Sequence, residues 1–89
     1  MIKKKVTIIN KLGLHARAAV KFVNLANRFT SSVKIEKGRN KIDGKSILGI
    51  LTLAAVQGTE ITLSISGKDE QSAVEALVVL ILDRFNEVE

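Results

Sequence analysis

The residues best able to do chemistry lie in one short run, Gly13-Leu14-His15-Ala16-Arg17-Ala18-Ala19. His15 is the single histidine of the chain, and it directly precedes a segment whose apolar residues have helical spacing. We therefore expect it at a helix N-terminus, where free backbone N–H groups and the helix dipole bind anions, the dipole contributing about 0.3–1 kcal/mol at exposed sites. The imidazole, the backbone N–H groups of Ala16 and Arg17, and the Arg17 guanidinium make a candidate phosphoryl-accepting site.

The alternative for His15 is an ordinary helix cap or surface residue. The local context favours a site, because Gly13 permits a tight turn and the small side chains of Ala16, Ala18 and Ala19 leave the helix start open. The helix field disfavours an imidazolium, which leaves one ring nitrogen available as a nucleophile. One histidine and no cysteine exclude a histidine-rich or cysteine metal site, and the missing Gly-x-Ser-x-Gly motif argues against a serine hydrolase.

Ser46 is a second candidate, just before the apolar run that starts at Ile47. It is typical of a helix N-cap, although Gly49 three residues later provides no capping box. The other interpretation is a regulatory phosphoserine. A phosphate there would be stabilised by the helix dipole and would repel an acidic partner instead of unfolding the helix.

The helix expected over residues 47–55, with Gln57-Gly58 as its C-terminal cap, has more apolar residues than one face can bury. If Ile50, Leu53 and Ala54 face inward, Ile47, Leu48 and Leu51 remain exposed. An exposed apolar patch of this kind often marks a docking site. The alternative is that another helix or a loop covers it.

The elements that position these residues follow from hydrophobic periodicity. Alternation predicts strands around 2–9, 33–36, 42 and 61–66, and helical spacing predicts a helix through Ala19, Phe22, Val23 and Ala26. A last helix begins after Asp69 as N-cap, with one face formed by Val74, Leu77, Val78, Ile81 and Phe85. The order βαββαβα predicts an α+β fold. We expect an open-faced two-layer sandwich whose four-stranded, mainly antiparallel sheet carries three helices on one face.

Composition limits the remaining possibilities. Eighty-nine residues make one domain, 1–89, and a net charge of +5 suggests acidic partners. The chain has three Phe and no Trp or Tyr, so we expect no nucleic-acid partner. No segment is typical of a leader or a membrane span, so we expect no membrane insertion and a cytoplasmic location. Glu87 and Glu89 are interpreted as a frayed tail.

Four motifs together resemble one known family: the run around His15, Lys45-Ser46-Ile47, Gln57-Gly58-Thr59, and Gly67-x-Asp69-Glu70. They are similar to HPr, the histidine phosphocarrier of the bacterial phosphoenolpyruvate-dependent phosphotransferase system. The resemblance covers nearly the whole chain at matching spacing. One position departs from it: the family usually has proline where this chain has Ala18, which restores a backbone N–H donor.

The resemblance implies a monomeric carrier without a cofactor, not an enzyme. His15 would take a phosphoryl group on Nδ1 from enzyme I and pass it to IIA domains, with Arg17 assisting. The partner surface would include the start of the first helix and the patch of Ile47, Leu48 and Leu51. Ser46 would be the target of a serine kinase, and the output would be sugar uptake or regulation. The alternative function is a small basic protein-binding regulatory module without phosphotransfer, in which His15 is only a cap.

Overall fold

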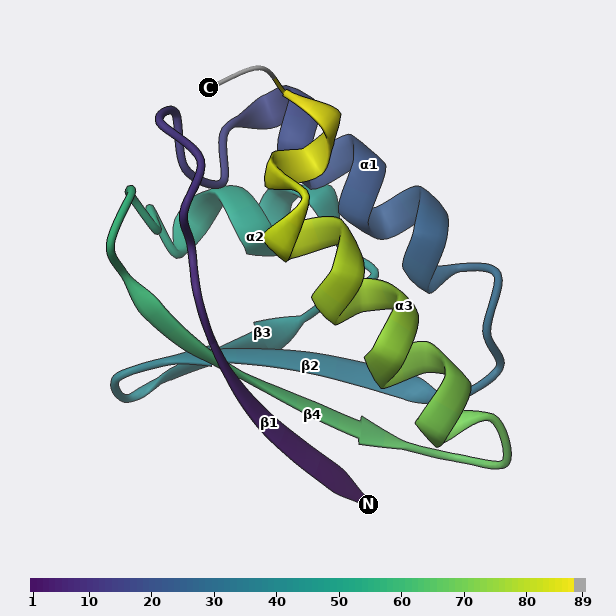
Figure 1. The fold of residues 1–89 in the computed structure, drawn as a ribbon. Helices are drawn as coiled ribbons and strands as arrows, with labels where there is room; N and C mark the ends of the chain where they lie inside the picture. The colour runs from purple at the N-terminus through teal and green to yellow at the C-terminus, as the bar shows by residue number, and fades with distance from the viewer. Residues whose placement is uncertain (88–89) are drawn as a thin grey trace.

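Four strands form one sheet with the spatial order β1-β4-β2-β3, and each neighbouring pair is antiparallel. The computed structural model describes residues 1–87. Figure 1 shows the helices on one side of the sheet, so the expected open-faced sandwich is confirmed. The elements are β1 (Ile2–Thr7), α1 (Ala16–Ala26), β2 (Ser32–Lys37), β3 (Asn40–Asp43), α2 (Ile47–Thr52), β4 (Glu60–Ser66), α3 (Glu70–Leu82) and the short 3-10 turn η1 (Arg84–Asn86).

The core lies between the sheet and the helices. On β4, the side chains of Ile61, Leu63 and Ile65 are buried, because every second residue of a strand points to the same face. The other strands contribute Val6, Val33 and Ile35 to this layer, while the opposite face of the sheet carries lysines, serines and threonines.

Helix α1 buries the face that its spacing predicts, including Phe22 and Val23. Ala18 and Ala19 are fully buried, so their small side chains allow α1 to pack closely on the core. Of the three alanines that were expected to open the helix start, only Ala16 is exposed. The open approach to His15 therefore depends on Ala16 alone.

Helix α2 is shorter than expected. It ends at Thr52, and the chain leaves it through a left-handed turn at Ala54, whose φ is 49°. The Nζ atom of Lys37 binds the carbonyl oxygens of Leu53 (2.9 Å) and Ala54 (3.4 Å), so a lysine from β2 takes the place expected for Gln57-Gly58. Ala54 is exposed, whereas Ile50 and Leu53 face inward as expected.

The start of α3 also differs from expectation. Asp69 holds the N-cap position as expected, but its side chain makes no cap hydrogen bond. Its carboxylate instead accepts the N–H groups of Thr30 (2.9 Å) and Ser31 (3.0 Å) and the Ser31 hydroxyl. The hydrogen bond from the Ser31 hydroxyl is the largest cause of a lowered pKa at Asp69, and the hydrogen bond from the Thr30 N–H lowers this pKa further. Asp69 therefore ties the loop after α1 to the start of α3.

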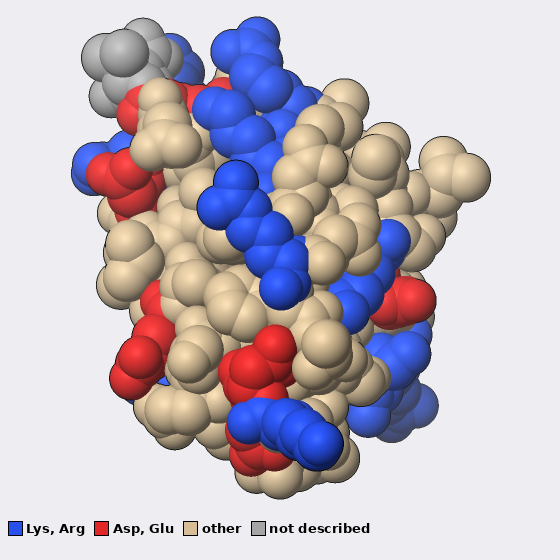
Figure 2. All heavy atoms as spheres, turned by 90° about the vertical axis from the view of Figure 1, so that its right-hand side faces the viewer, with Lys and Arg blue, Asp and Glu red and all other residues tan. Residues whose placement is uncertain are grey.

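The surface mixes both signs of charge. Figure 2 shows a run of Lys and Arg side chains on one face, with acidic and uncharged residues beside it. Within residues 1–87, no helix has both the length and the apolar character that crossing a membrane requires.

Candidate phosphoryl-accepting site

His15 is the N-cap of α1, as its sequence position predicts. Its backbone is extended (φ −78°, ψ 178°), and its Nδ1 accepts a hydrogen bond from the backbone N–H of Arg17 at 3.3 Å. About a quarter of the side chain is exposed (24%). The imidazole therefore lies at the positive end of the helix with one nitrogen directed at first-turn donors.

The loop before His15 is held against the end of α2. The N–H of Leu14 donates to the carbonyl of Ala55 at 2.8 Å. Gly13 has a φ of +67°, and a Cβ atom there would lie 2.4 Å from the same carbonyl oxygen. Only glycine accepts both this backbone conformation and this approach, so Gly13 fixes the place of His15 beside the segment after α2.

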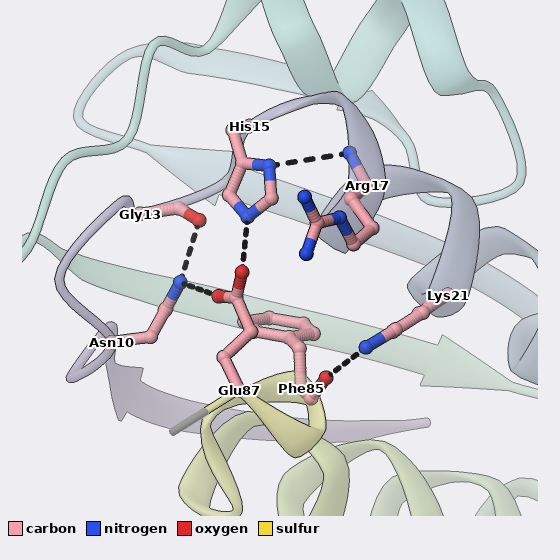
Figure 3. A network of polar contacts seen from close by, with 7 residues as sticks. All are labelled: Asn10, Gly13, His15, Arg17, Lys21, Phe85 and Glu87. Carbon is pink, nitrogen blue, oxygen red and sulfur yellow. Dashed lines mark hydrogen bonds and ion pairs between the residues drawn. The ribbon is translucent and has the colours of Figure 1, made fainter. Parts of the chain in front are cut away.

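Glu87 completes the site from the other end of the chain. Its Oε2 lies 2.7 Å from Nε2 of His15, and its Oε1 accepts Nδ2 of Asn10 at 2.8 Å (Figure 3). Asn10 also donates to the carbonyl of Gly13 at 2.8 Å. The interpretation of Glu87 as part of a frayed tail was wrong, because the side chain is only 11% exposed and binds the histidine. Glu89 lies outside the described residues.

A left-handed turn brings Glu87 to this place. After α3 ends, Arg84, Phe85 and Asn86 have φ values of 55°, 54° and 62°. Phe85 is fully buried, and its carbonyl accepts the Nζ of Lys21 from α1 (Figure 3). The expected helix face ran on to Phe85. Helix α3 instead ends at Leu82, and the turn that follows leads the chain to the contact between Glu87 and His15.

The contacts determine the proton positions. Because a backbone N–H donates to Nδ1, we assign the ring proton to Nε2, where Glu87 accepts it. Burial alone would raise the pKa of the Glu87 carboxyl. Hydrogen bonds from His15 and Asn10, with the charge of Arg17, outweigh burial and lower that pKa below its usual value. Glu87 is therefore a carboxylate, and Nδ1 keeps its lone pair.

Arg17 lies on the exposed side of the first turn of α1. Figure 3 shows its guanidinium on the same side of the helix start as the imidazole and the Glu87 carboxylate. A guanidinium can form two parallel hydrogen bonds to phosphoryl oxygens. The backbone N–H groups of Ala16 and Arg17 belong to the same turn. Together these donors can hold a phosphoryl group attached to Nδ1.

Ser46 and the apolar patch belong to α2. Ser46 caps this helix, because its Oγ accepts the N–H of Gly49 at 3.0 Å. The exposed fractions are 37% for Ile47, 76% for Leu48 and 37% for Leu51, so no neighbouring element covers them fully. Helix α2 packs beside α1, so the patch and the histidine are carried by adjacent helices.

Among residues 1–87, no three His, Cys, Asp or Glu side chains lie close enough together to bind a metal ion. Sequence reasoning found His15 and Arg17 but missed Asn10 and Glu87. The available signal for Asn10 was a polar residue directly after the apolar strand residues Ile8 and Ile9.

Comparisons with known proteins agree on one family. The family model described as PTS HPr component phosphorylation site matches residues 2–83. The phosphocarrier protein HPr of Cupriavidus necator is 49% identical over 89 residues, covering all of both chains. The crystal structure of HPr-C-His from Thermoanaerobacter tengcongensis superposes with a TM-score of 0.96 at 44% identity, covering all of both chains. The HPr dimer structure from that organism has a TM-score of 0.79 at 45% identity, covering 98% of this chain and 100% of the other. The chain, with its histidine at the start of α1, belongs to the HPr family of phosphotransferase-system phosphocarriers.

Proposed function

We propose that His15 accepts a phosphoryl group from phosphorylated enzyme I and passes it to IIA domains, in the cytoplasm. This proposal rests mainly on the different surroundings of the two nitrogens of the imidazole. Nε2 is bound to Glu87, and Nδ1 faces the N–H groups that begin α1. Incubation with phosphoenolpyruvate and enzyme I, followed by a test for acid-labile phosphate, examines it directly.

The reaction forms one bond to phosphorus as another breaks. The lone pair of His15 Nδ1 attacks the phosphorus of the phosphoryl group on enzyme I, and the enzyme I atom that carried this group leaves with the bonding pair. The long hydrogen bond from Arg17 N–H must release Nδ1 first, and that N–H then becomes available to a phosphoryl oxygen. The proton on Nε2 stays with Glu87 as acceptor throughout. Transfer to a IIA domain runs the same step in reverse.

Arg17→Ala should slow this exchange more than it changes stability. The side chain is exposed and loses little packing when it is shortened, but its positive charge is positioned to offset charge on the phosphoryl oxygens. We expect transfer rates to fall about tenfold, equivalent to roughly 1.4 kcal/mol, with a change of only a few degrees in Tm. Rapid-quench transfer and thermal unfolding measure both. A large loss of Tm with normal exchange would make Arg17 structural.

We propose that the patch of Ile47, Leu48 and Leu51 contacts enzyme I and the IIA domains. Leu48 is the most exposed of the three, so Leu48→Ala should leave folding intact and weaken association about tenfold. Chemical-shift mapping with enzyme I should perturb α2 and the His15 region together. Perturbations restricted to α3 would rule out this patch. Val56→Ala, a change at another exposed apolar residue beyond the helix, serves as a comparison.

Ser46 is proposed as a regulatory phosphorylation site for a serine kinase. A phosphate would add about −1.5 to −2 charges at the N-terminus of α2, beside the apolar patch. The dipole stabilises this charge, so Ser46→Asp should fold normally and accept phosphate from enzyme I several-fold more slowly. Rapid-quench assays of phosphoryl transfer with Ser46→Asp and Ser46→Ala measure the change in rate. Unchanged transfer by both Ser46→Asp and kinase-treated protein would leave Ser46 as a cap alone.

Two further expectations stay open to measurement. A monomer remains a prediction, because a relative from Thermoanaerobacter tengcongensis has been solved as a dimer. Sedimentation at several concentrations tests it. The second function, a small basic protein-binding regulatory module without phosphotransfer, predicts binding to a protein partner with no label on His15. No contact at the site favours it over the phosphocarrier.

A further inference from the structure

Strand β1 leaves one edge of the sheet unpaired. It is the terminal strand in the order β1-β4-β2-β3, and β4 lies on its other side. Ile8 continues the ladder, with its N–H on Thr59 O (2.8 Å) and its carbonyl accepting Gly58 N–H (2.7 Å). In an antiparallel pair, alternate residues direct their backbone groups toward the partner strand. Ile2, Lys4 and Val6 therefore pair with β4, whereas Lys3 and Lys5 direct their N–H and C=O groups outward.

An apolar groove runs beside this edge. It has a volume of about 370 Å³ and lies between β1 and α3, lined by Ile2, Lys4, Gln71, Val74, Glu75, Val78 and Val79. Val79 is 65% exposed. Helix α3 is apolar around most of its circumference, which exceeds what one buried face requires. The groove therefore offers apolar surface directly next to free backbone donors and acceptors.

The positive charge along β1 favours some binding partners over others. Lys3, Lys4 and Lys5 are exposed, and within residues 1–87 none of them forms an ion pair. Pairing with β1 of a second copy would bring two lysine triplets together, which like-charge repulsion opposes. An acidic segment is attracted by the same charges. The other edge strand, β3, has only four residues and so offers a shorter template.

We propose that the free edge of β1 and the groove beside α3 bind an extended protein segment in which acidic and apolar side chains alternate. Added as a fifth strand, it places every second side chain on the open face of the sheet, next to Lys3 and Lys5. The remaining side chains point toward the helices and enter the groove near Lys4 and Val79. The segment gains main-chain hydrogen bonds at the edge and apolar contact in the groove.

This surface is separate from the phosphoryl-accepting site. The groove lies along the first residues of β1 and the first turns of α3. Glu87 follows the C-terminal end of α3 and contacts His15 at the start of α1, and Figure 1 shows that this end of α3 lies far from the N-terminus of β1. A partner could therefore occupy β1 while His15 is phosphorylated. The proposal does not depend on the phosphocarrier function and is tested without enzyme I.

The probe is an end-blocked seven-residue peptide that alternates glutamate and valine, with a lysine–valine peptide as its control. Titration into isotope-labelled protein at low salt should shift the amide signals of β1 and of Val74, Val78 and Val79. Hydrogen exchange gives a sharper readout. In the free protein, the outward amides of Lys3 and Lys5 should exchange faster than those of Lys4 and Val6. Saturating peptide should then slow the exchange of Lys3 and Lys5.

Variants separate charge from backbone pairing. Lys3→Glu should weaken peptide binding about fivefold, whereas Arg39→Glu, the same charge change in the turn between β2 and β3, should leave it nearly unchanged. Lys5→Pro removes one outward N–H and should weaken binding about fivefold more than Lys5→Ala does. Proline is tolerated at an outward edge position, and retained protection of the β4 amides confirms that each variant folds.

Three results would overturn the proposal. Peptide shifts confined to α2 and the His15 loop would place binding on the other surface. If the lysine–valine peptide bound as tightly as the glutamate–valine peptide, the lysines of β1 would not select an acidic partner. Concentration-dependent slowing of Lys3 and Lys5 exchange without peptide would mean that a second copy of the chain occupies the edge.

Discussion

His15→Ala is expected to abolish acid-labile phosphorylation by enzyme I and phosphoenolpyruvate. His15 is the single histidine, so no other imidazole in the chain can form an N–P bond. The substitution also removes the cap on Arg17 N–H and leaves the Glu87 carboxylate without its partner. We therefore expect the free energy of unfolding to fall by about 1–2 kcal/mol, with the fold retained. Phosphoramidate labelling and denaturant unfolding measure the two effects.

His15→Gln separates the chemistry from the cap. Its side-chain oxygen can still accept hydrogen bonds near the helix start, and its amide can still donate toward Glu87. We expect it to recover part of the lost stability while acid-labile phosphate stays absent. Retention of acid-labile label in either variant would show that His15 is not the acceptor.

Strong local patterns made the fold predictable. On β4, Ile61, Leu63 and Ile65 alternate with Thr62, Ser64 and Ser66, and the structure buries the first set against the helices. The same reasoning placed His15 and Ser46 at the starts of α1 and α2, because capping depends on residues close in sequence. Helix α2 could not bury its whole apolar circumference, which predicted that Ile47, Leu48 and Leu51 would be exposed.

Contacts distant in sequence were not predictable in this way. Lys37 of β2 binds the carbonyls at the end of α2, and the carboxylate of Asp69, the N-cap residue of α3, binds the loop at Thr30 and Ser31 instead of the first turn of its own helix. Local propensity describes neither interaction, since each joins segments brought together only by the folded sheet. The expected C-terminal end of α2 and the expected side-chain cap of α3 were wrong for this reason, although Ser46 and Asp69 hold the N-cap positions that were expected.

The largest omission was Glu87, and the cause is the turn before it. Each of Arg84, Phe85 and Asn86 has a left-handed backbone, which costs about 1–2 kcal/mol for a residue with a Cβ. Burial of Phe85 returns roughly 1.5–3 kcal/mol, and further stabilisation comes from the hydrogen bond of Lys21 to its carbonyl and from those of Asn10 and His15 to Glu87. Packing therefore imposes a conformation that the local sequence disfavours, and periodicity alone extends the helix to Phe85 instead.

Glu87→Gln is expected to slow phosphoryl acceptance by His15 about tenfold or more. A charge-assisted hydrogen bond is worth about 1.5–3 kcal/mol, and the Nε2–Glu87 contact stabilises the ring as Nδ1 becomes bonded to phosphorus. The neutral amide also weakens the preference for a proton on Nε2. Nitrogen-15 shifts of the imidazole should show a greater share of the tautomer protonated on Nδ1. Single-turnover transfer from enzyme I measures the rate.

Glu60→Gln is the matched control, because it removes one exposed carboxylate from β4 at no contact with His15. It should leave the tautomer of His15 and the rate of phosphoryl transfer unchanged.

The pH dependence of the free energy of unfolding provides an independent measure. The pKa of Glu87 is lowered in the folded protein, so its stabilisation is complete above the ordinary range for glutamate and is lost as the pH falls through the lowered value. The wild type should therefore exceed Glu87→Gln in unfolding free energy at neutral pH, and the difference should shrink in acid. A slowed rate with an unchanged tautomer and a constant stability difference would contradict a positioning role, because the carboxylate would then act only on the partner protein.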